Sequence, residues 1–475
     1  MPEPSNPTLS TDIDIDPARL QRLLAGDVAH HLHPFTDPEE LRHRPPRLIV
    51  RGEGVRIWDA EGHEILDAMS GLWCVNLGYG RADLVRAAQE QMTRLPFYNT
   101  FFQTTTQPAA ELAAELSAIA PAGMRRVFFT EGGSTANDTM VRLVRRYWDV
   151  RGQPRRKVLI ARRNAYHGST LAAASLGGMA EMHAQGDLPL PGFSHIEQPH
   201  FLELGRPGES EAAFGLRAAG WLEQRIVELG PDRVAAFVME PVQGAGGVIV
   251  PAPGYAREIQ RICRRHGVLL VSDEVICGFG RLGHWFGCQH EHIGIEPDLI
   301  CFAKGVSSGY LPLGGVLVGA RVCDALEAGA GEFAHGFTYS GHPVCCAVAL
   351  ANLRALRGEG IVERVREHTA PYLQRRFAEL AAHPLAGDPC GLGMVAALVL
   401  WRDKRAREAF PPEARAGMRC RDACFDAGVV MRAVGPRMII APPLVCSDAD
   451  IDEMVRRIRC ALDATLQGLR ADGWL

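Results

Sequence analysis

The stretch VLLVSDEV at residues 268–275 decides the fold, and DLICFAK at residues 298–304 repeats its pattern. Both are continuous apolar runs, and each reaches a charged residue at its end, Asp273 in the first and Lys304 in the second. Runs without polar alternation indicate strands that are covered on both faces, which is typical of a mostly parallel sheet between helices. The sequence therefore predicts an α/β fold built around these two strands.

Further runs of the same kind lie on both sides of this stretch. They occupy residues 127–130, 157–162, 234–240 and 314–319. Helix-like amphipathic stretches fill the gaps, for example at residues 134–150 and 255–267, and Gly267 stands where a helix C-cap is expected. The alternation of strands and helices from about residue 100 to 330 predicts one large α/β domain.

The two ends of the chain follow another pattern. Residues 41–70 read as short strands with turns, and residues 343–475 combine long helices with isolated strands. We expect a large domain at residues 76–340 and a small α+β domain formed by residues 1–75 and 341–475. A ligand cleft would lie between the two domains, where α/β proteins commonly bind ligands.

Composition and charge exclude several classes of protein. The chain has 475 residues, with 51 Lys and Arg against 55 Asp and Glu, so its formal net charge of −4 gives no electrostatic reason to expect a nucleic-acid or membrane partner. No apolar run is long enough to span a bilayer. The opening residues 1–16 lack the basic and apolar regions of a secretory signal, and we expect a cytoplasmic protein.

Cysteine and histidine residues give no sign of a metal site. The 13 cysteines form no CxxC pair and stand mostly in apolar surroundings, which indicates buried thiols in a reducing compartment. His30, His31 and His33 form a cluster, but no cysteine or carboxylate stands at ligand spacing from them. The sequence therefore predicts no bound metal.

Several residues with reactive side chains stand at or just beyond the ends of the apolar runs. These are Tyr166, His167, Glu240, Asp273 and Lys304. Functional groups of α/β sheets collect at the carboxyl ends of the strands. Each residue alone is more often a cap or a solvated side chain. An acid after one buried strand, a lysine after the next and a glycine-rich helix start form a more specific combination.

This combination matches the requirements of pyridoxal 5′-phosphate (PLP). That cofactor needs a lysine for a Schiff base, a carboxylate for its ring nitrogen and a cradle for its phosphate. Lys304 and Asp273 meet the first two needs. Gly132, Gly133 and Ser134 meet the third, because a helix start offers unpaired N–H groups and a positive dipole end. By itself the glycine-rich start would be read as a simple N-cap.

Five ordered motifs resemble those of the class III PLP-dependent aminotransferases of fold type I. They are AYHGST (165–170), MEPVQGAGG (239–247), VLLVSDEVICGFGRLG (268–283), AKG (303–305) and FTYSGHP (337–343). The resemblance extends from HPFTD at residues 34–38 to APPL at residues 441–444. It implies a large domain with a mostly parallel seven-stranded sheet between helices and a small α+β domain formed by both termini.

Three further motifs look most like the ω-amino-acid/amine:pyruvate branch of this family. They are GLWCVNLGYG (71–80), LPFYNTFF (95–102) and MRAVG (431–435). The resemblance implies a ping-pong transamination that moves an amino group from an ω-amino acid or a primary amine to pyruvate. It also implies a homodimer with shared active sites, which could pair further into a tetramer.

The resemblance assigns roles to individual residues. Lys304 would hold PLP as a Schiff base and move the substrate proton, and Asp273 would pair with the ring nitrogen. Further cofactor contacts would come from Gly133, Ser134, Tyr166, Glu240, Val275 and, from the partner subunit, Thr338. The substrate pocket would be lined by Phe35, Trp73, Phe101, Tyr166 and Arg432. Arg432 would bind a substrate carboxylate and swing aside for an uncharged amine.

The chain departs from the family pattern at two places. Relatives commonly carry a serine where this chain has Gly132, so one hydrogen bond to the phosphate would be missing. Arg437 follows Pro436 where relatives carry a small polar or acidic residue. A second arginine near Arg432 would change the preference for substrate carboxylates.

Alternative functions remain at this point. Within the same fold, 2-oxoglutarate could replace pyruvate as acceptor, or the enzyme could be an aminomutase or racemase. Residues 278–283 also form a GxGxxG pattern, which would suit a nicotinamide-dependent oxidoreductase, but the residues after it do not read as a helix start. The physiological donor stays open among β-alanine, taurine, a polyamine and an aromatic amine.

Overall fold

The computed structural model describes residues 15–329 and 331–475. Most of the opening segment, whose composition argued against a secretory signal, lies outside the described residues. Within the described part of the chain, no helix has both the length and the apolar character that crossing a membrane requires.

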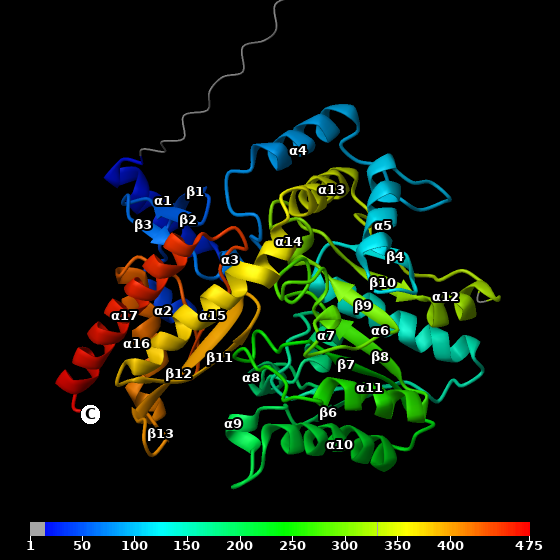
Figure 1. Cartoon of the computed structure of the whole chain (residues 1–475). Helices are drawn as coiled ribbons and strands as arrows, with labels where there is room; N and C mark the ends of the chain where they lie inside the picture. Colours follow the sequence, from blue (N-terminus) through cyan, green and yellow to red (C-terminus); the bar gives the residue numbers. More distant parts are fainter. Residues whose placement is uncertain (1–14, 330) are drawn as a thin grey trace, which may run out of the picture.

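A seven-stranded sheet forms the centre of the larger part of the molecule (Figure 1). Its strands, in spatial order, are β4 (Met124–Thr130), β10 (Gly314–Gly319), β9 (Leu299–Phe302), β8 (Leu269–Asp273), β7 (Val234–Met239), β5 (Val158–Arg162) and β6 (Phe193–Ile196). Neighbouring strands pair in parallel from β9 to β6, whereas β10 runs antiparallel to both β9 and β4. The mostly parallel sheet predicted from the apolar runs is confirmed.

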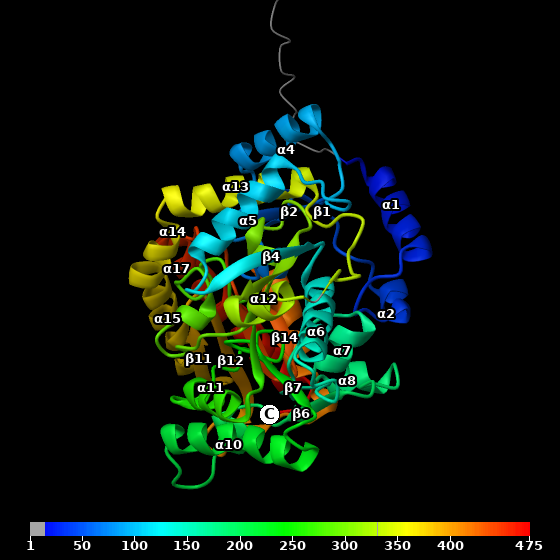
Figure 2. The same cartoon turned by 90° about the vertical axis from the view of Figure 1, so that its right-hand side faces the viewer.

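Helices cover both faces of this sheet. Phe214 of α10 and Ile259 of α11 pack with Phe237 on one face, while Val144 of α6 packs with Val271 on the other. Figure 2 turns the side that carries α12 toward the viewer. The helices of this part are α5 (Gln107–Ile119), α6 (Gly133–Val150), α7 (Leu171–Leu176), α8 (Ala180–Ala184), α9 (Phe201–Leu204), α10 (Glu211–Leu229), α11 (Tyr255–His266) and α12 (Ala320–Glu327).

Two predicted helices are confirmed with nearly the expected bounds. The stretch 134–150 is α6, and the stretch 255–267 is α11 followed by Gly267. Gly267 has a φ of 66° and caps the helix through N–H bonds to the carbonyls of Arg264 and Cys263. A left-handed backbone of this kind favours glycine, which explains why the helix ends there.

The two ends of the chain come together beside the large sheet. The N-terminal sheet contains β1 (Ile49–Glu53), β2 (Arg56–Asp59) and β3 (Glu64–Leu66), all antiparallel. The C-terminal sheet contains, in spatial order, β11 (Ala386–Leu392), β12 (Val395–Asp403), β15 (Arg437–Ile440) and β14 (Arg432–Val434), with β13 (Glu408–Ala409) pairing with β12. Leu66 joins the two ends, since its N–H binds the Gly428 carbonyl at 2.8 Å and its carbonyl accepts from Val430 at 2.9 Å.

The remaining helices flank these sheets. They are α1 (Pro17–His30), α2 (Pro38–His43), α3 (Ser70–Trp73), α4 (Ala82–Arg94), α13 (Pro343–Gly358), α14 (Ile361–Arg364), α15 (Ala370–Ala378), α16 (Ala416–Asp426) and α17 (Asp448–Ala471). α13 packs on α4 and α5, so the chain beyond residue 340 first contacts the large-sheet side. The domain bounds at residues 75/76 and 340/341 stay a prediction.

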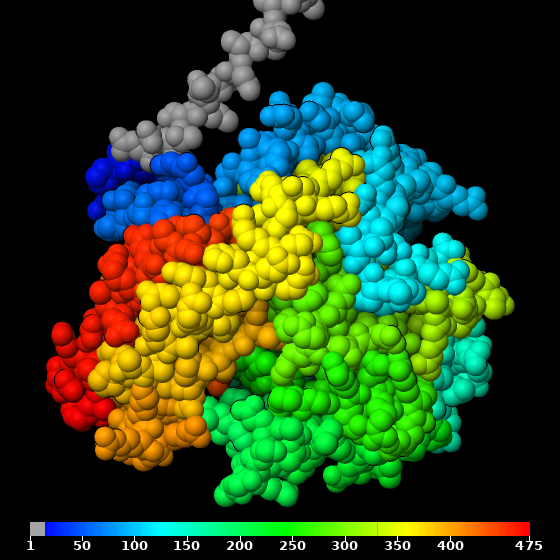
Figure 3. All heavy atoms as spheres, viewed as in Figure 1, coloured from blue at the N-terminus to red at the C-terminus, as the bar shows by residue number. Residues whose placement is uncertain are grey.

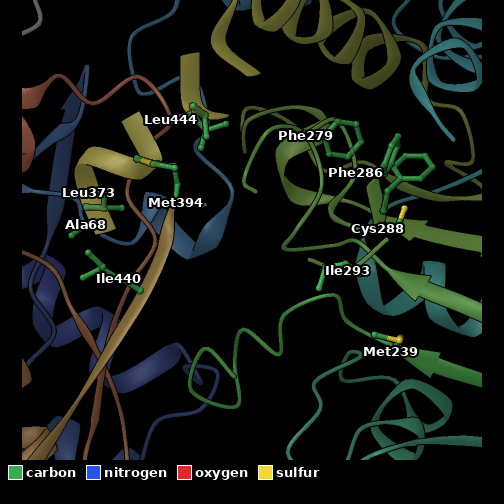
Figure 4. Close-up of a cluster of buried hydrophobic side chains, with 14 of the residues drawn as sticks. Ala68, Met239, Phe279, Phe286, Cys288, Ile293, Leu373, Met394, Ile440 and Leu444 are labelled. Carbon is green, nitrogen blue, oxygen red and sulfur yellow. The ribbon is translucent and has the colours of Figure 1, made fainter. Parts of the chain in front are cut away.

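One hydrophobic cluster extends through both parts of the molecule (Figure 4). Phe279 and Phe286 contribute from the large-sheet side, whereas Met394, Ile440 and Leu444 contribute from the C-terminal part. Such continuous burial fixes the two parts relative to each other, and this places groups from the C-terminal sheet against the strand ends of the large one.

Candidate active site

Asp273 is the last residue of β8, and its side chain is buried. Its Oδ2 accepts a hydrogen bond from Asn137 Nδ2 at 2.9 Å and lies 2.7 Å from His167 Nδ1, while Oδ1 accepts from the Val275 N–H at 3.1 Å. Three donors from three segments fix the orientation of this carboxylate, because a buried charge needs such partners.

Asn137 is a member of this network that the sequence analysis missed. It lies one turn inside α6 and also donates to the carbonyl oxygens of Gly133 at 3.2 Å and His167 at 2.9 Å. A fully buried polar residue on the sheet-facing side of a helix was the available signal. Asn137 Oδ1 and His167 Nε2 are buried without a hydrogen-bond partner in the described residues.

Lys304 follows β9, the strand next to β8 in the sheet. Asp273 pairs with Cys301 across the two strands, so Lys304 stands at the same edge as the carboxylate. Burial lowers the pKa of the Lys304 ammonium, and the charges of Asp273 and Glu240 partly oppose that shift. The ammonium makes no hydrogen bond to any part of the chain that the structure describes.

The sequence holds only three lysines, Lys157, Lys304 and Lys404. The ammonium of Lys157 is bound by Asp149, and Lys404 is exposed and donates to the Ala381 carbonyl. Lys304 thus combines a pKa lowered by burial with an amine that has no hydrogen bond in the described chain and stands at a strand end. A covalent bond to a carbonyl cofactor needs such an amine.

Glu240 follows β7 and is buried. Its Oε1 accepts from the Tyr166 N–H at 3.2 Å and its Oε2 from the Gly244 N–H at 3.0 Å. Burial raises the pKa of the Glu240 carboxyl, and the nearby His167 opposes that shift. Glu240 thereby orients the backbone of Tyr166, whose hydroxyl lies 3.1 Å from Ser169 Oγ.

The glycine-rich segment forms the start of α6. A Cβ on Gly133 would lie 3.0 Å from Val275 Cγ1, so a side chain there would crowd Val275. Gly132 differs, because its φ of 176° suits any residue and a Cβ would have no atom within 4 Å. Ser134 Oγ accepts from the Ser169 N–H at 3.0 Å. The first amides of α6 lack intrahelical acceptors, as at every helix start, and can bind an anion.

Arg432 approaches the same edge from the C-terminal sheet, and Phe35 from the turn between α1 and α2. Arg432 opens β14 and is partly buried, and its guanidinium has no hydrogen-bond partner in the described chain. Burial lowers its pKa, Tyr166 opposes that shift, and the guanidinium in turn lowers the pKa of Lys304. The Phe35 ring is 78% exposed, and its centroid lies 6.4 Å from that of Tyr166.

Trp73, Phe101 and Thr338 have different surroundings. Trp73 is buried in a cluster that includes Val248 and Ile439. Phe101 is partly exposed and lies against the segment of Thr338, because a Cβ on Gly336 would be 2.6 Å from its ring. Thr338 is exposed. The substrate role of Trp73 and Phe101 and the cofactor role of Thr338 stay predictions.

Arg437 has partners of its own, away from Lys304. Its guanidinium is buried, donates to the Gly247 carbonyl at 2.8 Å and lies 3.0 Å from His200 Nε2. It lines a cleft of about 610 Å³ between the large-sheet and C-terminal parts, together with Asp388 and Cys390. Figure 3 shows a hollow between the orange and green segments there. Neither Lys304 nor Arg432 lines this cleft. An effect of Arg437 on substrate carboxylates stays a prediction.

The histidine cluster also differs from the expectation. Asp27 Oδ1 lies 2.9 Å from His31 Nδ1, and Oδ2 lies 2.6 Å from His33 Nε2. A carboxylate partner therefore exists one helical turn before the histidines, where α1 ends. Both of its oxygens are already occupied by imidazole nitrogens. The expectation of no metal stays a prediction.

The assembled groups fit PLP. The free amine of Lys304, the fixed carboxylate of Asp273 and the anion-binding start of α6 correspond to the aldehyde, ring nitrogen and phosphate of the cofactor. The glycine at position 133 leaves a cradle that a Cβ would fill. These contacts come from α6, β8 and β9, which the sheet brings to one edge.

Comparison with known proteins agrees with this geometry. The chain is 54% identical over 443 residues to a putrescine–pyruvate aminotransferase of Pseudomonas aeruginosa. The aligned region covers 93% of this chain and 96% of that protein. A thermostable (S)-enantioselective omega-transaminase from Thermomicrobium roseum superposes with a TM-score of 0.90 at 42% identity, covering 94% of this chain and 99% of that one.

A second solved structure bears on the cofactor. The omega-transaminase of Pseudomonas jessenii in complex with PMP has a TM-score of 0.91 and 40% identity, covering 95% of this chain and 100% of that one. The family model for class-III aminotransferases, which use PLP, matches residues 39–462. The fold and family expected from the motifs are confirmed, and the chain belongs to the class-III aminotransferases.

Proposed function

We propose that this protein transfers an amino group from a primary amine or an ω-amino acid to pyruvate. The relative at 54% identity, named for putrescine and pyruvate, is the observation that carries this proposal. It favours an aliphatic diamine as the donor. That relative and this chain align over almost their full lengths, so the similarity includes the strand ends described above.

Lys304 is proposed as the residue that moves the proton. PLP, when bound, withdraws electrons from the substrate carbon that bears the amino group. The depressed pKa of Lys304 favours the neutral amine, which would accept the proton from that carbon and deliver it to the cofactor side, as transamination requires. Asp273, held by Asn137 and His167, would pair with the ring nitrogen of the bound cofactor.

The remaining site residues hold the two ligands. Gly133 and Ser134 would hold the phosphate through the start of α6, and Tyr166 and Val275 would hold the cofactor ring. Arg432 binds the pyruvate carboxylate, because its guanidinium is partly buried and unpaired and lies within electrostatic reach of Lys304. Phe35, Trp73 and Phe101 line the substrate pocket.

A donor panel tests this proposal. Purified protein loaded with PLP is assayed with putrescine, β-alanine and an arylalkylamine, each with pyruvate and with 2-oxoglutarate, and the amino-acid product is measured. We expect alanine from pyruvate, with putrescine as the best donor. Glutamate as the main product would transfer the proposal to the 2-oxoglutarate acceptor. Amine rearrangement without any acceptor would indicate an aminomutase.

We further propose a homodimer in which Thr338 reaches the partner's phosphate site. Aromatic side chains are exposed around this residue, with Phe102 at 90% and Tyr339 at 56%, and the Phe97 and Tyr339 rings lie 5.7 Å apart. Exposed apolar patches of this kind mark interfaces. A second copy would cover them and bring Thr338 to the other active site.

Mixing two inactive variants tests this assembly. A Lys304→Ala protein mixed with a Thr338→Asp protein yields heterodimers in which one site has both Lys304 and a partner Thr338. We expect activity to reappear on mixing and the molar mass to be that of a dimer or tetramer. A monomer, or no recovery on exchange of subunits, would contradict the shared site.

A cytoplasmic location is proposed from the cysteines. All 13 are free thiols in the structure, and ten of them are buried. Thiols of this kind persist in a reducing compartment. Fractionation of the native cells with an antibody to this protein would test the location.

A further inference from the structure

The backbone of Lys304 is strained. Its φ is +48°, in the left-handed region that residues with a Cβ rarely adopt, and a single 3-10 turn, Lys304–Val306, follows directly. Such a conformation persists only where the surroundings enforce it. The direction in which the Lys304 side chain leaves the sheet edge depends on this φ, so whatever holds the turn also aims the amine.

Asn352 holds the turn from one side. It lies on α13, about 50 residues further along the chain, and is completely buried. Its Nδ2 donates to the carbonyl oxygens of Gly305 and Val306, both at 2.9 Å, and its Oδ1 accepts from Ser308 Oγ at 2.5 Å. Both amide hydrogens and the amide oxygen are thus used on Gly305, Val306 and Ser308, all within four residues of Lys304.

Asn76 closes the turn from the other side. A Cβ on Gly305 would lie 2.5 Å from Asn76 Nδ2, so the amide packs directly against this peptide. Asn76 is itself fixed, because its Nδ2 donates to the Phe279 carbonyl at 2.9 Å and its Oδ1 accepts from Arg281 at 2.8 Å. The peptide after Lys304 is therefore contacted by two buried amides from segments far apart in the sequence.

We infer that Asn352 is a positioning residue for Lys304: its two hydrogen bonds to the Gly305 and Val306 carbonyls hold the left-handed backbone that directs the amine toward Asp273. The inference rests on the proposed role of Lys304. Neither hydrogen bond touches substrate or cofactor, so Asn352 acts only through the lysine. Leucine has nearly the same size as asparagine but donates nothing, which makes Asn352→Leu the informative change.

The test measures the reactivity of Lys304 and uses the other two lysines, Lys157 and Lys404, as internal standards. In the cofactor-free protein, the acetylation of Lys304, Lys157 and Lys404 by acetic anhydride is followed against pH by mass spectrometry. We expect Asn352→Leu to move the labelling midpoint of Lys304 upward, toward that of an ordinary lysine, and to leave Lys157 and Lys404 unchanged. In the loaded enzyme, kcat falls about tenfold to a hundredfold, because misplacing a reacting group by about 1 Å has effects of this size.

Two further variants keep the result decisive. Asn352→Ala leaves room for water at the two carbonyls and serves if the leucine variant fails to fold; it should show the same shift to a smaller degree. Thr465→Val removes a buried hydrogen bond of α17, from Thr465 Oγ1 to the Ala461 carbonyl, and controls for general destabilisation. It should lower the melting temperature and leave the labelling of Lys304 as in the wild type.

The outcomes separate the two proposals. An unchanged Lys304 midpoint in both Asn352 variants, or an equal shift in Thr465→Val, would overturn the positioning role. A shifted midpoint in a protein that shows no transamination with any donor would support the positioning role and remove the proposed function.

Discussion

The proposed cofactor side and the proposed substrate side of the site are built in different ways. On the cofactor side, Asp273 and Glu240 are buried and each is held by at least two hydrogen bonds from the chain itself. On the substrate side, Arg432 is unpaired in the described chain and Phe35 is 78% exposed. The first side is organised before any ligand arrives, whereas the second has side chains free to rearrange.

From this difference we infer that the rigid part of the site determines the reaction rate, whereas the other part determines which substrates bind. Preorganised groups are aimed at charge that develops during reaction, and their rigidity avoids rearrangement at that moment. A mobile arginine, by contrast, can meet a carboxylate in one half-reaction and yield space to an uncharged amine in the other. Mutations on the two sides should therefore act on different kinetic constants.

The largest effect is expected from Lys304. Lys304→Ala should lower turnover by at least about 10⁴-fold, because it removes both the covalent attachment and the proton transfer. It should also abolish the visible absorption of the lysine-bound cofactor. Turnover and spectra are measured beside a Lys404→Ala control, which should behave as wild type. Retained absorption in Lys304→Ala would assign the attachment to another amine.

Asp273→Asn tests the rigid side without changing its shape. We expect kcat to fall about a hundredfold to a thousandfold, as for the loss of a preorganised electrostatic group, with a KM for pyruvate close to the wild-type value. The melting temperature of the cofactor-free protein should change little, since the amide keeps two of the contacts. Steady-state kinetics on both substrates check this. A rise in KM without loss of kcat would erase the distinction between the two sides.

Arg432→Ala tests the mobile side. We expect kcat/KM for pyruvate to fall about 30- to 150-fold, since hydrogen bonds to a charged group are worth roughly 2–3 kcal/mol. The half-reaction with an arylalkylamine, followed by single-turnover spectroscopy, should stay near the wild-type rate. Arg437→Gln is the matched control, because that guanidinium lines the other cleft. Equal losses in the two half-reactions would contradict a carboxylate role for Arg432.

Gly132→Ser should have the smallest effect, and a favourable one. Gly132 has an extended backbone and open space around its Cβ position, so a serine fits without strain. One added hydrogen bond to the phosphate is worth about 1 kcal/mol, or about fivefold in cofactor affinity. Equilibrium titration of the cofactor-free protein measures this. Gly133→Ser is the opposing control and should weaken binding, because its Cβ would press on Val275.

The sequence was sufficient to predict the central strands of the large sheet and the two residues, Asp273 and Lys304, that stand at its carboxyl edge. Unbroken apolar runs such as 268–275 and 298–304 are strands whatever surrounds them, because both of their faces must be buried. β6 (Phe193–Ile196) had no such signal, since this edge strand is only partly buried. Asp273 and Lys304 were found because they end neighbouring strands, and parallel strands end at one edge.

By itself, the sequence determined which chemical groups the site contains: one lysine, one acid, an aromatic ring and a glycine-rich helix start in a fixed order along the chain. Only the tertiary structure decided how these groups are held. It places Asn137 and His167 in contact with Asp273. It places Arg437 at the lining of a separate cleft, and it places Asn352 in contact with the strained turn of Lys304. The reason is physical: a local pattern fixes the type and burial of a segment, whereas hydrogen bonds between distant segments depend on packing that no short stretch encodes.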